Sequence, residues 1–171
     1  MPLTPKAIYE DFMNKELDKT FAIELLQTLI ENTENIESRK ESIRILDKIP
    51  FTDNSNFKFL EHLLISDLNE EIRNLTCKVL KNHYLDKALA PISWLLEHEK
   101  SLKCLDTAIS ALSEINTDES KSILVEKLKK LSNKESKYNF EEIFKNKKLE
   151  SFDIQDLADI LLNYYNLNLK I

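Results

Sequence analysis

Apolar residues along the chain recur with the spacing of an α-helix. Leu102, Leu105, Ile109 and Leu112, for example, fall on one helical face by their i, i+3 and i+7 spacing. Capping residues precede several such stretches, as Thr4 does ahead of Pro5. The pattern predicts about ten helices, near residues 5–15, 18–31, 35–49, 55–66, 69–83, 87–98, 101–115, 118–131, 136–148 and 153–165.

The predicted helices also repeat in pairs. Equivalent apolar residues are separated by 34, 32 and 32 positions in three parallel series: Leu26, Leu60, Ile92 and Leu124; Ile30, Leu64, Leu96 and Leu128; and Leu46, Leu80, Leu112 and Phe144. A period near 33 with two helices in each unit is typical of an α-solenoid, in which neighbouring units cover each other's apolar faces. The sequence therefore predicts an all-α solenoid.

The composition supports this prediction and excludes several function classes. The chain has no glycine, so it holds neither a GxxxxGK[ST] loop nor a GxGxxG turn for phosphates. The net charge of −6 argues against a protein that coats nucleic acid. Cys77 and Cys104 fall within apolar helical patterns and are expected as reduced core thiols. The N-terminal MPLTPKAIYEDF is unlike a signal peptide, and no apolar run is long enough to enter a membrane, so a soluble, cytoplasmic protein is expected.

The segment "DLNEEIR" resembles the D-x-x-x-x-[VI]-R signature of HEAT repeats, with Asp67, Ile72 and Arg73 in the motif positions. Asp67 is expected to accept hydrogen bonds from the N–H groups that open the second helix of the unit. Arg73 is expected to face the seam and bind acids or carbonyls of a turn, in its own unit or the adjacent one. Arg39 holds the equivalent register in the unit before.

The resemblance implies a right-handed α-α superhelix within a single domain over 1–171. Its units would be 18–49, 55–83, 87–115 and 118–148, with 5–15 and 153–165 as capping helices. The stretch "ALAPISWLLEHE" also resembles a HEAT first helix, in which Pro91 is expected to bend or open the helix locally.

In proteins of this family the second helices line the concave face and commonly bind the partner. A helical wheel places these polar residues outward on that face: Lys40, Glu41, Arg44, Lys48, Asn74, Lys78, Lys81, Asn82, Asp106 and Ser110. The resulting hypothesis is a non-enzymatic adaptor or scaffold that binds another protein as a monomer or weak homo-oligomer. It would need no cofactor and no metal.

Two alternatives remain open. Residues 127–148 hold eight lysines and three acids with interleaved aromatics, a pattern that can bind nucleic acid. This would make the protein similar to the alkylated-DNA glycosylases built on HEAT-like repeats. Separately, Leu167, Leu169 and Ile171 alternate in the manner of a strand, so that 166–171 could serve as a docking peptide.

A metal site is disfavoured by the positions of the histidines. One family of HEAT-like proteins, the di-iron hydroxylases, uses repeated His-Glu pairs. Here Glu61-His62 and His98-Glu99 differ in order and do not share a repeat register, so the repeat would not bring them together. His83 aligns with Ile49 and is expected to lie in the seam.

Overall fold

The computed structural model describes residues 3–133, 138–145 and 147–169, and every regular element within these ranges is helical. The all-α prediction is therefore confirmed for the described residues. The helices form two compact units, one ending at Tyr84 and the other beginning at Leu85. A single domain over 1–171 stays a prediction.

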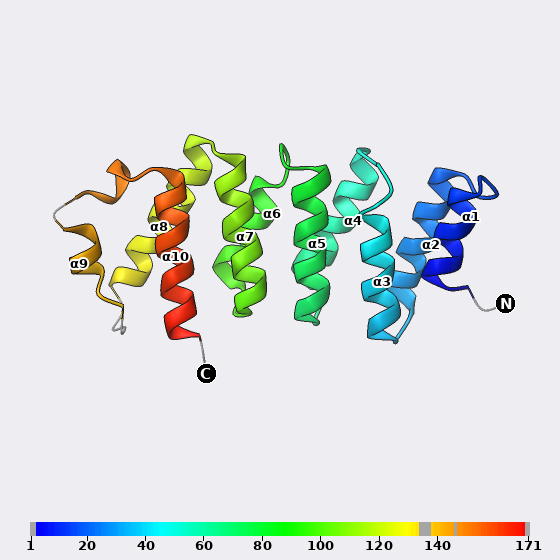
Figure 1. The fold of residues 1–171 in the computed structure, drawn as a ribbon, viewed down its shortest axis with the longest axis horizontal. Coiled ribbons are helices and arrows are strands. Elements are labelled where there is room, and N and C mark those ends of the chain that lie inside the picture. Colours follow the sequence, from blue (N-terminus) through cyan, green and yellow to red (C-terminus); the bar gives the residue numbers. More distant parts are fainter. Residues whose placement is uncertain (1–2, 134–137, 146, 170–171) are drawn as a thin grey trace. The chain divides into compact units, whose positions relative to one another are not determined.

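The first unit contains five helices (Figure 1). They are α1 (Pro5–Met13), α2 (Lys19–Asn32), α3 (Ile36–Leu46), α4 (Asn54–Ser66) and α5 (Glu70–His83). The second unit contains α6 (Leu89–His98), α7 (Leu102–Ile115), α8 (Asp118–Ser132), the short α9 (Phe140–Phe144), the 3₁₀ helix η1 (Leu149–Ser151) and α10 (Ile154–Asn168).

Short polar side chains start these helices. Thr4 accepts a hydrogen bond from the Ala7 amide and Pro5 occupies the first turn of α1, as predicted. Thr117 and Ser120 form a reciprocal capping box at the start of α8. Helix α7 ends with Asn116 in the left-handed conformation, at φ 50°. Glycine is the usual residue at such a position, but the chain has none.

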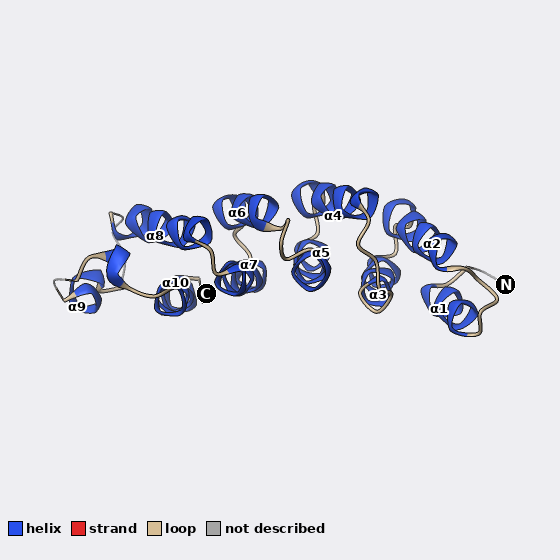
Figure 2. Ribbon diagram, turned by 90° about the horizontal axis from the view of Figure 1, so that it is seen from above, coloured by secondary structure: helices blue, strands red, loops and turns tan. Residues whose placement is uncertain are grey.

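Within each unit the helices lie in two layers (Figure 2). In the first unit α2 and α4 form one layer and α1, α3 and α5 the other, with α3 packed against α2, α5 and α1. In the second unit α6 and α8 form one layer, while α7 and α10 lie in the other. Each unit thus places two helix pairs side by side.

The repeated apolar positions form the core of both units. All members of the first two series, from Leu26 to Leu124 and from Ile30 to Leu128, are completely buried. In the third series Leu46, Leu80 and Leu112 are completely buried as well. Cys77 and Cys104 are free and buried, which confirms their prediction as core thiols.

The last hairpin differs from the predicted one. Phe144, the fourth member of the third series, is only partly buried and lies in the five-residue α9. The helix that packs on both α7 and α8 is instead α10, predicted as a cap. The physical reason is the apolar stripe: α9 buries only Phe140, whereas α10 buries residues along its whole length, including Leu157, Leu161 and Tyr165.

Pro91 does not interrupt its helix. Helix α6 begins at Leu89, later than the predicted residue 87, and runs without a break to His98. Pro91 therefore lies in the first turn, where its missing N–H would have had no intrahelical acceptor. The expected opening is not observed, and the proline ring is buried in the core instead.

A matched pair of leucines tests the core. Leu80 is fully buried and Leu68 is 99% exposed, so the same Leu→Ala substitution samples the two extremes of burial in one unit. We expect Leu80→Ala to lower the free energy of unfolding by about 2–5 kcal/mol, and Leu68→Ala to change it by less than about 0.5 kcal/mol. Urea denaturation followed by circular dichroism measures both. Equal effects would contradict the assignment of Leu80 to the core.

Candidate protein-interaction surface

The signature turn joins the two helix pairs of the first unit through two arginines. The Arg39 Nε donates to the Ile30 carbonyl at 2.6 Å, and its Nη2 forms an ion pair with the Asp67 carboxylate. The Arg73 Nη1 donates to the carbonyl oxygens of Asp67 and Leu68 at 2.9 and 3.1 Å. Arg39 therefore connects adjacent helix pairs, while Arg73 holds the turn of its own pair, as predicted.

Asp67 does not cap the second helix directly. Its Oδ1 accepts from the Asn69 amide at 2.9 Å, one residue before α5 begins. The N-cap is Asn69, whose Oδ1 accepts from the amides of Glu71 and Ile72 at 2.9 and 3.2 Å. The predicted role of Asp67 is corrected accordingly. Asn69 caps α5, and the second carboxylate oxygen of Asp67, Oδ2, forms the ion pair with Arg39. Ile72 is fully buried behind this turn.

Lys40 was expected to point outward and does not. Its side chain is only 10% exposed and pairs with Glu37 at 2.8 Å and with Glu71 of α5. Hydrogen bonds to these two carboxylates raise the pKa of Lys40 above its ordinary value. The helical wheel placed it outward because it treats α3 as isolated, whereas packing of α5 on α3 covers this position. Lys40 is thus a contact between helices rather than part of an exposed surface.

The other three residues predicted on α3 share one hollow. Glu41, Arg44 and Lys48 line a cavity of about 490 Å³ between α1 and α3, together with Glu37, Ile45, Lys6 and Tyr9. The Lys48 Nζ lies 5.5 Å from the centre of the Tyr9 ring, within the range of a cation–π interaction. Sequence analysis missed Lys6 and Tyr9 because it treated α1 only as a cap. The apolar spacing of Ile8 and Phe12 on that helix was the available signal of a packed partner.

The predicted residues of α5 divide into two groups. Lys78 is exposed, whereas Asn74 and Lys81 are half-buried. Asn82 is exposed but donates from its Nδ2 to both carboxylate oxygens of Asp47, at 3.1 and 3.2 Å, and so connects α5 to the end of α3.

His83 lies in the seam of the same unit, as expected. Its Nε2 is 3.0 Å from the Asp47 carbonyl oxygen, and its ring stacks on Phe51 at 4.5 Å.

In the second unit, Asp106 and Ser110 of α7 are exposed as expected. The exposed side of α3 and α5 in the first unit is called the second-helix face below.

Three of the six described lysines of the lysine-rich segment pair with acids. The Lys127 Nζ donates to the Leu96 carbonyl at 2.7 Å and, with Lys130, contacts the Glu97 carboxylate. Lys129 pairs with Glu150 at 2.6 Å. Residues 134–137 and 146 of this segment lie outside the described residues. The paired lysines belong to α8 and tie it to α6 and η1.

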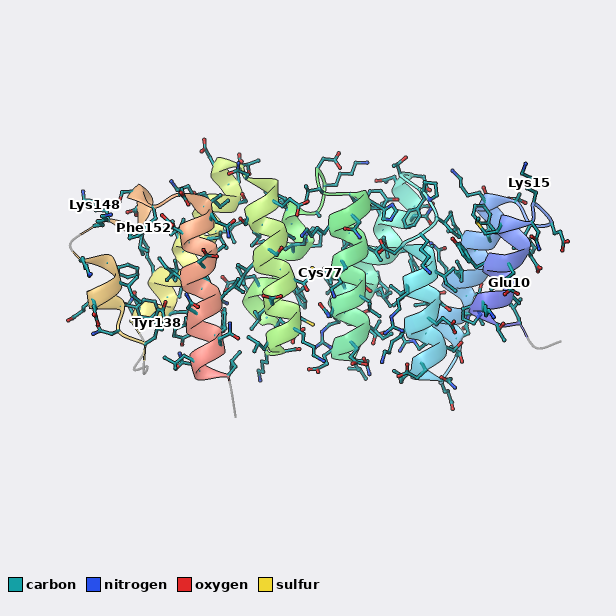
Figure 3. The ribbon with its side chains drawn as sticks, viewed as in Figure 1. Glu10, Lys15, Cys77, Tyr138, Lys148 and Phe152 are labelled. Carbon is teal, nitrogen blue, oxygen red and sulfur yellow. The ribbon has the colours of Figure 1, made fainter. Side chains whose placement is uncertain are left out.

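The aromatic residues of the segment pack on α10. The Tyr138 and Phe140 rings both contact Tyr164, at 5.8 and 5.5 Å between ring centres. Phe144 contacts Phe152 at 6.2 Å, and Tyr138 and Phe152 lie beside α9 (Figure 3). Burial raises the pKa of Tyr138 and of Tyr165, whose pKa is raised further by Tyr164 and Glu97. Phe140 is buried among these rings, and Tyr138 and Phe144 are partly buried.

The predicted docking tail is helical where it is described. Helix α10 extends to Asn168, beyond the predicted residue 165, and therefore includes Leu167. The strand-like alternation expected for this tail is wrong at these positions, because the apolar stripe of α10 continues past Tyr165. Leu167 and Leu169 are partly exposed, at 50% and 37%. Ile171 lies outside the described residues.

The histidines take part in local contacts. His62 lies 3.4 Å from the Ser66 hydroxyl, and His98 stacks on Trp94 with 4.3 Å between ring centres. Within residues 3–133, 138–145 and 147–169, no cluster of three or more His, Cys, Asp or Glu side chains is arranged to hold a metal ion. The hydroxylase-like arrangement gains no support from these contacts.

Comparison of the chain with protein-family models, with curated proteins and with solved structures gives no match. None of the helices in the described part of the chain is both long and apolar enough to cross a membrane.

The Arg39–Asp67 pair can be tested by a double-mutant cycle. Because Arg39 makes two charge-assisted contacts from a position only 15% exposed, we expect Arg39→Ala to destabilise the protein by about 1.5–3 kcal/mol. The cycle with Asp67→Asn is expected to give a coupling of at least about 0.5 kcal/mol. Arg44→Ala, on an exposed arginine of the same helix, serves as the control and should be nearly neutral. Additive effects of the two substitutions would contradict the proposed clamp.

Glu97 makes a pH-dependent contribution to stability. Burial opposes its ionisation, but Lys127 and Lys130 outweigh burial and hold the pKa of Glu97 below its ordinary value of 4.5. A carboxyl group whose pKa is lower in the folded state than in the unfolded state stabilises the fold. The full stabilisation is present at pH values above the unfolded-state pKa, and it is lost as the pH falls through the folded-state pKa. At neutral pH we therefore expect Glu97→Gln to destabilise the protein by about 0.5–1 kcal/mol.

The difference between wild type and Glu97→Gln should shrink below pH 4.5. Urea denaturation at a series of pH values measures it. Glu126→Gln, on an exposed residue of α8, is the matched control and should show no such trend. A difference that is constant with pH would show that the ion pairs of Glu97 contribute nothing.

Proposed function

We propose that this chain is a non-enzymatic protein-interaction adaptor that binds a partner protein on its second-helix face. The hollow between α1 and α3 is the observation that carries the proposal. It brings together three of the residues expected on that face, Glu41, Arg44 and Lys48, with two from a helix distant in sequence. A hollow lined by charged side chains around an aromatic ring provides both polar contacts and apolar area for a protein ligand.

The packing beneath this face favours a binding role. Ile43, Ile45 and Leu46 of α3 are buried in the core, so the exposed residues of this helix project from a fixed support. A preformed surface loses little conformational entropy on binding. The proposal also includes the HEAT-like right-handed superhelix, which is supported by the repeated buried positions and by the Arg39 contacts between helix pairs.

The nucleic-acid alternative receives less support. Lys127, Lys129 and Lys130 each pair with a carboxylate, and those contacts would have to break before the lysines could bind phosphates. Two buried, reduced cysteines fit the proposed cytoplasmic location. The proposed solution state is a monomer or a weak homo-oligomer.

Charge reversal on the second-helix face tests the proposal. Arg44 and Lys78 are exposed residues on α3 and α5, and no carboxylate pairs with either of them among the described residues. We expect the double variant Arg44→Glu/Lys78→Glu to lose most of the protein partners captured by wild type from its native cell extract. Quantitative affinity enrichment measures the loss, and the thermal midpoint should stay within a few degrees of wild type.

A charge-matched control comes from the first helices of the same unit. Lys19 of α2 and Lys58 of α4 are exposed, so Lys19→Glu/Lys58→Glu introduces the same change in net charge on the other layer. This variant should capture the same partners as wild type. If the two double variants and wild type all capture the same set, partner binding does not use the second-helix face.

A further inference from the structure

We propose that the hollow between α1 and α3 binds an acidic helical segment of a partner protein. The segment would carry two carboxylates one helical turn apart, with an apolar side chain between them. This inference rests on the proposed function and specifies the chemistry of the partner at one site. Its basis is the arrangement of charge along α3.

Arg44 and Lys48 supply the recognition of acids. Arg44 lies in the last turn of α3 and Lys48 follows four residues later in the turn after the helix, and both side chains line the same hollow. Both are exposed, and no described carboxylate forms an ion pair with either. Two carboxylates one turn apart on a second helix match this spacing, which is why a helical ligand is favoured.

Arg44 is also distinct among the arginines. The chain has three, and Arg39 and Arg73 both donate to groups of the signature turn. Arg44 makes no comparable internal contact and retains its planar donors for an external acceptor. Arginine is enriched at protein interfaces because these donors match a carboxylate. The lining of the hollow thus contains an exposed arginine whose side-chain donors can bind a carboxylate of a partner.

The floor of the hollow is apolar. Ile45 is 6% exposed and the half-buried Tyr9 ring lies under Lys48, so an apolar side chain of the ligand could contact both. Burial of that side chain would supply the hydrophobic part of the affinity, at roughly 25 cal/mol for each Å² removed from water. The chemistry therefore calls for an amphipathic segment rather than a purely acidic one.

Two acidic residues of α3 also line the hollow, and they favour one orientation of the bound segment. Glu37 and Glu41 lie toward the start of α3, and Glu37 pairs with Lys40 while Glu41 has no ion-pair partner among the described residues. The charge therefore changes from acidic to basic between the start of α3 and the turn that follows it. A ligand with a basic residue opposite Glu41 and acids opposite Arg44 and Lys48 is complementary, and its charge-inverted form is repelled at all three.

The test uses the full chain and synthetic peptides as the probes. The matched peptide is a fluorescein-labelled, alanine-rich helix with one lysine, a leucine and two glutamates a turn apart on one face. The inverted peptide exchanges lysine and glutamate, and the neutral peptide has glutamine in place of both. Fluorescence anisotropy at low ionic strength measures binding, and added salt should weaken it because the contacts are exposed ion pairs.

We expect saturable binding of the matched peptide, with the inverted and neutral peptides at least about tenfold weaker. Arg44→Glu/Lys48→Glu should abolish binding of the matched peptide and improve binding of the inverted one. The milder Arg44→Ala/Lys48→Ala should weaken the matched peptide by about tenfold without loss of the helical circular dichroism signal. Lys19→Glu/Lys58→Glu is again the matched control and should bind as wild type does.

Equal binding of the matched and inverted peptides would overturn the inference, as would no saturation up to about millimolar concentration. Binding of the matched peptide with unchanged affinity in Arg44→Ala/Lys48→Ala would place the peptide elsewhere and overturn it too. These results leave the proposed function intact if Arg44→Glu/Lys78→Glu still loses its protein partners. If partner capture is also unchanged, the second-helix face itself is not the binding surface.

Discussion

The structure depends on apolar side chains that no helix pair can hide by itself. Leu26, Leu60 and their equivalents are completely buried where the helices of each unit pack together. Burying one leucine is worth about 1.5–3 kcal/mol, so repeating the same position along the chain provides the main stabilisation of both units. The polar contacts are secondary in energy but decide how the pairs meet.

The Arg39–Asp67 contact illustrates that second role. Hydrophobic burial is not directional and would tolerate a sliding of one pair along the other. Arg39 fixes the pairs at one position because it contacts the end of α2 at Ile30 and the turn after α4 at Asp67. Lys40, between Glu37 and Glu71, and the Asp47–Asn82 contact join α3 to α5 at other levels. Each of these residues is thereby unavailable for an external ligand.

The periodic part of this arrangement could be predicted from the sequence, and the rest depended on packing. Spacing alone located the helices and the buried series, because helical geometry converts a repeat of residue types into a repeat of positions. Lys40 was misplaced since exposure on a wheel ignores the neighbouring helix. Phe144 continued the series in the sequence, but Lys145 adopts a left-handed backbone directly after it and α9 ends there. The longer apolar stripe of α10 then covers α7 and α8.

The same distinction applies to the candidate site. Glu41, Arg44 and Lys48 could be predicted because they are close together in sequence, in α3 and the turn after it. Lys6 and Tyr9 depended on the packing of α1 against α3, a contact between helices distant in sequence. That packing also places the Tyr9 ring beneath the Lys48 ammonium group. Residues that take part in the polar contacts between helices stabilise the helix packing, and the remaining polar residues face outward. Such an arrangement separates stability from specificity, because the outward residues can change without loss of the buried series.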